Sequence, residues 1–259
     1  MSSRTAEYLI STKPSMPQNI YDQREFFENY IKLDRQTKGL EGAPDWPRLR
    51  AMLPDLKGAR VLDLGCGFGW FARFARSKGA AHVRGIDISA KMLDKARSMT
   101  SDDAITYEEA DLEDVTLPEA EYDVVFSSLA FHYLASLPRL MAEIGRSLKR
   151  GGRLVFSAEH PLFTAPTTPS LVVDPDTGRK VWQIDAYQRE GVRMRTWFVE
   201  GVRKQHRTVG SYINMVLNSG LRLTDFVEWC PSEEELASNP GLDVELIRPT
   251  FLLMGAMKD

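Results

Sequence analysis

The chain has 259 residues, of which 43% are hydrophobic and 27% are charged, and its formal net charge is −3. This length suffices for one large hydrophobic core, and the composition is that of an ordinary globular protein. A slightly acidic chain does not suit a surface that neutralises many phosphates, so nucleic acid is not an expected partner. Two cysteines, Cys66 and Cys230, can form neither a disulfide framework nor a cysteine zinc cluster.

Residues 1–20 are polar, contain two prolines and have no apolar run long enough for a signal peptide. We expect them to form an arm on the surface. Nowhere does the chain have about 18 consecutive apolar residues. We therefore expect no transmembrane helix and no membrane partner, and a cytoplasmic location is the simplest interpretation.

Apolar spacing predicts a helix over residues 21–33 and a shorter one over residues 46–53. The first helix either folds over the active site as a cover or packs on the core, and both alternatives stay open. We group residues 1–55 as an N-terminal arm with cover helices.

Short strands alternate with amphipathic helices from residue 60 onwards. Such alternation indicates an α/β fold with a parallel sheet built by right-handed crossovers. The predicted strands cover residues 60–64, 82–88, 105–110, 122–127 and 153–157, and after a helix over residues 209–217 two more follow at 221–229 and 250–257.

Residues 160–207 interrupt this alternation with prolines, glycine turns and alternating apolar positions, which predicts an inserted antiparallel β meander. Because the insert follows a parallel strand, it lies at the edge of the sheet where open α/β folds bind ligands. We therefore assign residues 56–259 to one domain that carries this insert as a lid or substrate platform.

The segment VLDLGCGFGW, residues 61–70, is a buried strand that leads into a loop with glycine at every second position. Glycine lets a ligand approach the bare backbone, and the following helix offers unpaired N–H groups. The next strand ends at Asp87, about 20 residues further on, where a carboxylate can accept both hydroxyls of a ribose. Together these features predict a cofactor that contains a nucleoside.

A dinucleotide fingerprint requires a small residue at position 70, where this chain has Trp70. An indole there would obstruct the close packing of helix on strand that the small residue permits. NAD is therefore less favoured, although a nicotinamide-dependent oxidoreductase with an unusual loop stays an alternative.

Five segments in this order resemble the motifs of class I S-adenosylmethionine-dependent methyltransferases, over residues 58–158. They are VLDLGCGFGWFARFA, GIDIS, ADLEDV, YDVVFSSLAFHYL and LKRGGRLVFS. The most similar branch is the small-molecule type related to enzymes of ubiquinone and menaquinone biosynthesis. The resemblance implies a Rossmann-like, doubly wound fold whose seven-stranded sheet is mostly parallel with an antiparallel last strand. It also implies S-adenosylmethionine as cofactor and S-adenosylhomocysteine as product.

The resemblance implies that Asp87 holds the ribose, that Ile88 and Met92 lie against the adenine, that Asp111 accepts from the adenine amino group and that Leu112 supplies a backbone contact. Asp111 alternatively only caps a turn.

At the methionine end, the resemblance implies that the backbone of Gly65, Cys66 and Gly67 passes the cofactor while Asp63 anchors it. Ser127 and Ser128 lie beside the sulfonium in this interpretation, or they only end a strand.

Methyl transfer from a sulfonium is an in-line displacement that needs a base only if the acceptor must lose a proton. His132, Glu159 and His160 are the catalytic candidates, because they follow the fourth and fifth strands at the open edge of the sheet. A lone histidine is more often a structural residue. No helical spacing of histidines supports a metal site, so none is expected.

Tyr30, Tyr133 and Arg207 are the predicted substrate contacts. The insert is locally basic, which indicates either a solvated hairpin face or an arginine, Arg207 foremost, that binds an anionic acceptor such as a carboxylate.

The favoured function is methyl transfer to oxygen, nitrogen or carbon of a small-molecule acceptor, in a monomer or a homodimer. Methylation of a macromolecule is an alternative, but Ser127-Ser128-Leu129-Ala130 replaces the Asn/Asp-Pro-Pro-aromatic pattern of enzymes that methylate the amino groups of bases and glutamine. A protein that binds the cofactor without turnover is a further alternative.

Overall fold

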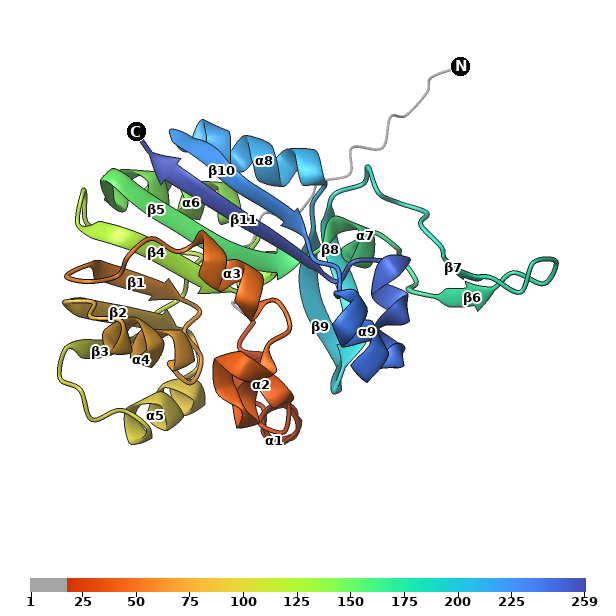
Figure 1. Ribbon diagram of the computed structural model, residues 1–259, viewed down its shortest axis with the longest axis horizontal. Coiled ribbons are helices and arrows are strands. Elements are labelled where there is room, and N and C mark those ends of the chain that lie inside the picture. Colours follow the sequence, from red (N-terminus) through yellow and green to blue (C-terminus); the bar gives the residue numbers. More distant parts are fainter. Residues whose placement is uncertain (1–17) are drawn as a thin grey trace, which may run out of the picture.

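The computed structural model describes residues 18–259, so most of the predicted arm over residues 1–20 lies outside the described residues. A seven-stranded sheet crosses the molecule in the spatial order β10-β11-β5-β4-β1-β2-β3 (Figure 1). Its strands are β1 (Arg60–Leu64), β2 (His82–Asp87), β3 (Ile105–Glu109), β4 (Tyr122–Ser128), β5 (Leu148–Glu159), β10 (Leu221–Glu228) and β11 (Phe251–Lys258).

Strands β1 to β5 pair in parallel, whereas β11 pairs antiparallel with both β5 and β10. This confirms the predicted α/β fold with a mostly parallel seven-stranded sheet and an antiparallel last strand. Strands β1 and β4 are almost continuously buried, because helices cover both faces of the sheet. The chain order reverses between β1 and β4, so a crevice opens at their carboxyl ends.

Each face of the sheet has its own hydrophobic core. On one face, α6 (Leu137–Ser147) and α8 (Val209–Asn218) bury their apolar stripes. On the other face, α3 (Trp46–Met52) and α4 (Trp70–Ser77) do the same. Helix α5 (Ala90–Ser98) contacts β2 and β3, and its N-cap Ser89 accepts a hydrogen bond from the Met92 N–H.

The remaining elements lie at the carboxyl edge of the sheet or beside it. Before α3 come η1 (Ile20–Asp22), α1 (Arg24–Tyr30), α2 (Asp34–Thr37) and η2 (Gly39–Gly42); η3 (Phe131–Tyr133) follows β4; α9 (Glu233–Ser238) and η4 (Pro240–Leu246) follow β10. The helix predicted over residues 21–33 is divided, because Gln23 is extended between η1 and α1. No helix within residues 18–259 is long and apolar enough to cross a lipid bilayer.

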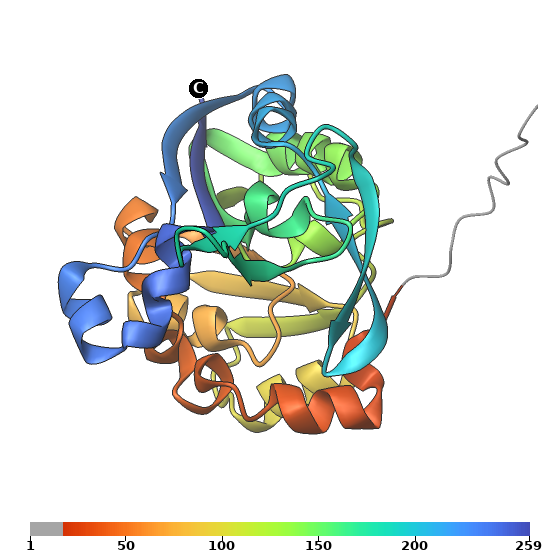
Figure 2. The ribbon, with the colours of Figure 1, turned by 90° about the vertical axis from the view of Figure 1, so that its right-hand side faces the viewer.

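The insert is antiparallel, but it forms two separate ribbons instead of one meander. After α7 (Pro161–Thr164), β6 (Leu171–Val173) pairs with β7 (Lys180–Trp182), and β8 (Gly191–Trp197) pairs with β9 (Val199–His206). The tip of the β8–β9 hairpin reaches the N-terminal helices (Figure 2), where both segments share a third hydrophobic cluster. The N-terminal helices and the insert, predicted as separate segments, are therefore in contact.

Candidate functional site

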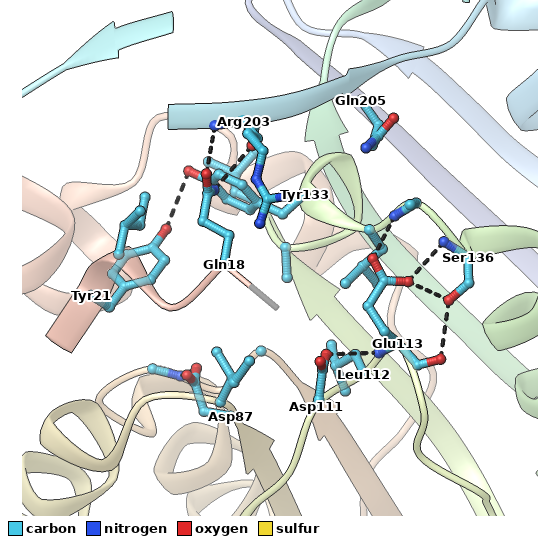
Figure 3. Close-up of a pocket in the computed structure, with 18 of the residues that line it drawn as sticks. Gln18, Tyr21, Asp87, Asp111, Leu112, Glu113, Tyr133, Ser136, Arg203 and Gln205 are labelled. Carbon is cyan, nitrogen blue, oxygen red and sulfur yellow. Dashed lines mark hydrogen bonds between the residues drawn. The ribbon is translucent and has the colours of Figure 1, made fainter. Parts of the chain in front are cut away.

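A cavity of about 780 Å³ opens at the carboxyl ends of β1, β2 and β4 (Figure 3). This volume is typical of a site for a cofactor or a small molecule. Its wall combines the glycine loop, the ends of three strands, the N-terminal segment and the β8–β9 hairpin. The predicted residues that line it are Gly65, Gly67, Asp87, Ile88, Met92, Asp111, Leu112, Ser128, Tyr30 and Tyr133.

The glycine loop exposes backbone at the floor of this cavity. Gly65 has a φ of 72°, and a Cβ atom built on it would lie 2.5 Å from the Cβ of Ala130. Only glycine fits both the left-handed conformation and this close approach. The N–H groups of Gly65 and Cys66 both donate to the Ile86 carbonyl, at 2.8 and 3.0 Å, which fixes the bend. The Cys66 side chain is itself buried and lies outside the cavity wall.

Asp87 joins the glycine loop to the next helix. Its carboxylate accepts hydrogen bonds from the N–H of Gly67 at 2.8 Å and from that of Ser89 at 2.9 Å. Burial raises the pKa of Asp87 in spite of these bonds. Each carboxylate oxygen can accept more than one hydrogen bond, so both oxygens retain capacity for hydroxyl groups in the cavity.

Asp63 lies beneath this loop, outside the cavity wall, and is 2% exposed. Burial, and then the charge of Asp87, raises its pKa to about 8, and Arg73 offsets only part of this. Its Oδ2 has no hydrogen-bond partner among residues 18–259. Burial without a partner favours the protonated form of this carboxyl, and its position outside the wall offers no support for its predicted contact with the cofactor.

Asp111 and Leu112 line the same side of the cavity as Asp87, and Arg203 lies across from them (Figure 3). Asp111 accepts from the N–H of Glu113 at 2.9 Å, which turns the chain, and burial raises the pKa of its carboxyl. The Glu113 carboxylate in turn accepts from the backbone N–H groups of Ala135 and Ser136, at 2.6 and 2.7 Å. This pairing joins the loops that follow β3 and β4 into one wall.

Tyrosines and the end of β4 line another part of the cavity wall. The hydroxyls of Tyr21 and Tyr133 lie 3.3 Å apart. Ser128 lines the cavity, whereas Ser127 is buried and donates to the Leu64 carbonyl at 2.8 Å. The next residue, Leu129, also lines the cavity with a φ of 55°, a conformation that is strained for leucine.

His132 and Glu159 lie behind Tyr133, outside the cavity wall. The ring centroids of His132 and Tyr133 are 4.4 Å apart, and the Nδ1 of His132 accepts from the Glu159 N–H at 3.3 Å. Burial, followed by the charge of Lys204, lowers the pKa of His132 well below its usual value, so the ring is neutral. The Lys204 ammonium forms an ion pair with the Glu159 carboxylate. His132 therefore contacts Tyr133 from outside the cavity, while Glu159 is held by Lys204 and by its N–H bond to His132.

His160 also lies outside the wall, and both of its ring nitrogens are occupied. Nδ1 accepts from the Leu162 N–H at 3.0 Å and caps α7, while Nε2 lies 2.8 Å from a carboxylate oxygen of Glu228. These contacts give His160 a structural role and offer no support for its predicted catalytic role. Within residues 18–259 no group of three or more His, Cys, Asp or Glu side chains is arranged to hold a metal ion.

Arg207 is buried away from the cavity. Its guanidinium donates to the carbonyls of Leu134 and Ala135, the latter at 3.2 Å. Side chains alternate along β9, so Lys204 and His206 are buried while Arg203 and Gln205 line the cavity. Arg203 is therefore the insert cation that faces the cavity (Figure 3).

The predicted site residues included neither Arg203 and Gln205 nor Gln18, Tyr21 and Val192, although all five line the cavity. Strand alternation groups Arg203 with Gln205, but it does not say which face of the hairpin turns toward the cofactor edge.

Comparisons with known proteins agree on one family. A family model described as a methyltransferase domain matches residues 62–156. The solved structure of an S-adenosylmethionine-dependent methyltransferase from Mesorhizobium loti is 46% identical, with a TM-score of 0.82 over 85% of this chain and 100% of that one. An uncharacterised Haemophilus influenzae protein is 32% identical over 93% of this chain and 97% of its own length. A malonyl-[acyl-carrier protein] O-methyltransferase from Pectobacterium atrosepticum is 39% identical over 110 residues, 42% of either chain.

Proposed function

This protein belongs to the S-adenosylmethionine-dependent methyltransferases, and on that premise we propose that it methylates an oxygen, nitrogen or carbon atom of a small-molecule acceptor. The observation that carries the proposal is one continuous cavity with two chemically different ends. The acidic end, at Asp87 and Asp111, suits the nucleoside. The end lined by tyrosines and the hairpin suits an acceptor. We keep residues 56–259 as the methyltransferase domain, with residues 160–207 as its acceptor-side insert.

Two observations support the fit of the cofactor. The Asp87 carboxylate in the cavity wall can accept the ribose hydroxyls, and at Gly65 and Gly67 the wall is bare backbone without a side chain. We assign the ribose to Asp87. Asp111 and Leu112 would contact the adenine, with Ile88 and Met92 against its face. Of the two serines, only Ser128 lines the cavity, and we assign it to the sulfonium end.

The bound cofactor supplies a methyl group already activated on sulfur, so the chain has to align the acceptor and exclude water. Tyr21, Tyr30 and Tyr133 enclose the acceptor end, and Leu129, Ala130 and Val192 add apolar surface. Bulky macromolecular acceptors fit poorly under this cover of N-terminal segment and hairpin.

We further propose that the acceptor carries an anionic group that Arg203 binds, with Gln205 beside it. A charge-assisted hydrogen bond from a guanidinium to a carboxylate contributes about 1.5–3 kcal/mol. The relative from Pectobacterium atrosepticum is a malonyl-[acyl-carrier protein] O-methyltransferase, so malonyl thioesters belong among the acceptors to be tried.

The test measures S-adenosylhomocysteine formed by the full chain from S-adenosylmethionine and a panel of small carboxylates, each paired with its neutral amide. We expect turnover of at least one carboxylate. Arg203→Gln should raise the KM of the enzyme for that carboxylate by about tenfold or more. Arg189→Gln is the matched control, because Arg189 lies exposed on the same insert. Turnover of amides in preference to acids, or equal KM values in the two variants, would contradict the anionic acceptor.

A further inference from the structure

The N-terminal segment and the β8–β9 hairpin form one cap over the cavity, although more than 160 residues separate them in the chain. Phe26 of α1 packs edge-on against Trp197 and Phe198 at the hairpin tip, with ring centroids 5.2 and 5.6 Å apart. Phe198 has a φ of 61°, which is strained for an aromatic residue, and this conformation presents its ring to α1. Val202 of β9 is fully buried in the same cluster.

The side-chain amide of Gln18 bonds to the backbone of Arg203 on β9, in the way that a neighbouring strand would bond with its backbone. Its amide nitrogen donates to the Arg203 carbonyl at 3.1 Å, and its amide oxygen accepts from the Arg203 N–H at 2.6 Å. Both backbone groups of Arg203 are thus held by one side chain from the N-terminal segment. Arg203 is also the residue that faces the acceptor end of the cavity.

The same segment is attached to the cofactor end through Asp22 and Asn19. The Asp22 carboxylate accepts from the Ser89 hydroxyl at 2.5 Å and from the Lys91 N–H at 3.2 Å. The amide of Asn19 donates to the Ile88 carbonyl at 3.2 Å. Ser89 and Ile88 directly follow Asp87, the proposed ribose ligand, and the Ser89 N–H donates to the Asp87 carboxylate.

We propose that Gln18 and Asp22 are positioning residues that couple cofactor binding to the placement of Arg203 at the acceptor end. The inference rests on the proposed function of the cavity. Ile20 and Tyr21, between the two anchors, line the cavity, so a bound cofactor contacts the segment and the body of the domain together. A ligand that contacts both stabilises the docked segment, and through Gln18 it stabilises β9. The acceptor end is therefore completed on the cofactor-loaded enzyme.

The test follows exchange of the Arg203 amide hydrogen by NMR in the full chain, with and without saturating S-adenosylhomocysteine. We expect the product to slow this exchange by about tenfold or more in the parent chain, since binding suppresses local opening. In Gln18→Ala the exchange should be fast and change less than about twofold with the product, and Asp22→Ala should also lose most of the slowing. Gln23→Ala is the matched control, because this exposed glutamine makes no side-chain hydrogen bond to any residue from 18 to 259.

Calorimetry of the same variants with S-adenosylhomocysteine provides the second readout. Linkage requires the coupling to be reciprocal, so Gln18→Ala and Asp22→Ala should weaken binding by about 3- to 10-fold and Gln23→Ala should not. Gln18→Glu retains the acceptor for the Arg203 N–H and should restore part of the protection. Equal slowing of the Arg203 amide in the parent chain and in Gln18→Ala overturns the coupling. Failure of the parent chain to bind the product overturns the proposed function instead.

Discussion

The buried carboxyl of Asp63 predicts a pH-dependent penalty on the stability of the ligand-free protein. Its pKa is about 8, against 3.8 for an exposed aspartate, because burial and Asp87 disfavour the charged form. The native state therefore retains a proton that the unfolded chain releases. Stability must fall as the pH rises from about 4 to about 8 and then level off.

The magnitude follows from about 1.4 kcal/mol per pH unit between the two pKa values. The penalty is about 3 kcal/mol at pH 6 and about 6 kcal/mol at pH 9. Asp63→Asn removes the titration, and any cost of burying its amide is independent of pH. The stability of Asp63→Asn relative to the parent should therefore increase by about 3 kcal/mol between pH 6 and pH 9.

Urea unfolding of the ligand-free parent and variant at both pH values measures this difference. Asp103→Asn, a change of an exposed carboxylate, is the control and should show no such dependence. If the parent and Asp63→Asn differ by the same amount at pH 6 and pH 9, Asp63 is not a buried acid of raised pKa, and the reasoning fails.

Three further predictions concern single residues. Gly65→Ala places a methyl group 2.5 Å from Ala130 in a left-handed backbone, so binding of S-adenosylhomocysteine should weaken by about 30-fold or more in calorimetry; near-parent affinity would refute the close fit. His160→Ala removes the acceptor for the Leu162 N–H, so the free energy of unfolding should fall by about 1–2 kcal/mol while the affinity for S-adenosylhomocysteine stays unchanged. Loss of turnover in this variant without loss of stability would show a catalytic role. Phe198→Ala should lower the free energy of unfolding by about 2 kcal/mol, measured in urea, and parent-like stability would show that the hairpin tip is not held by its ring.

The central sheet and the cavity wall around Gly65 and Asp87 were predictable because their signals are local. The bend at Gly65 and the carboxylate at Asp87 belong to neighbouring strands, and the spacing along the chain reflects a short path in space. Alternating strands and helices dictate a parallel sheet wherever they occur, so the fold required no knowledge of distant contacts.

The part of the cavity that we propose for the acceptor depends on contacts between distant segments, which no local pattern records. Gln18 and Arg203 are 185 positions apart, and only the folded structure reveals that the N-terminal segment and the insert meet. Arg207 and Arg203 look equivalent in the sequence. Arg207 follows the last residue of β9 and turns into the body of the domain, whereas Arg203 lies within the strand on the cavity side.

The most direct test of the account is calorimetric titration of the full chain, and of Asp87→Ala, with S-adenosylhomocysteine. We expect one binding site per chain in the parent and an affinity at least about 30-fold lower in Asp87→Ala, because the ribose hydroxyls lose a charged acceptor. Asp103→Asn should bind like the parent. Equal affinity in the parent and Asp87→Ala, or no binding by the parent at millimolar concentrations, would contradict it.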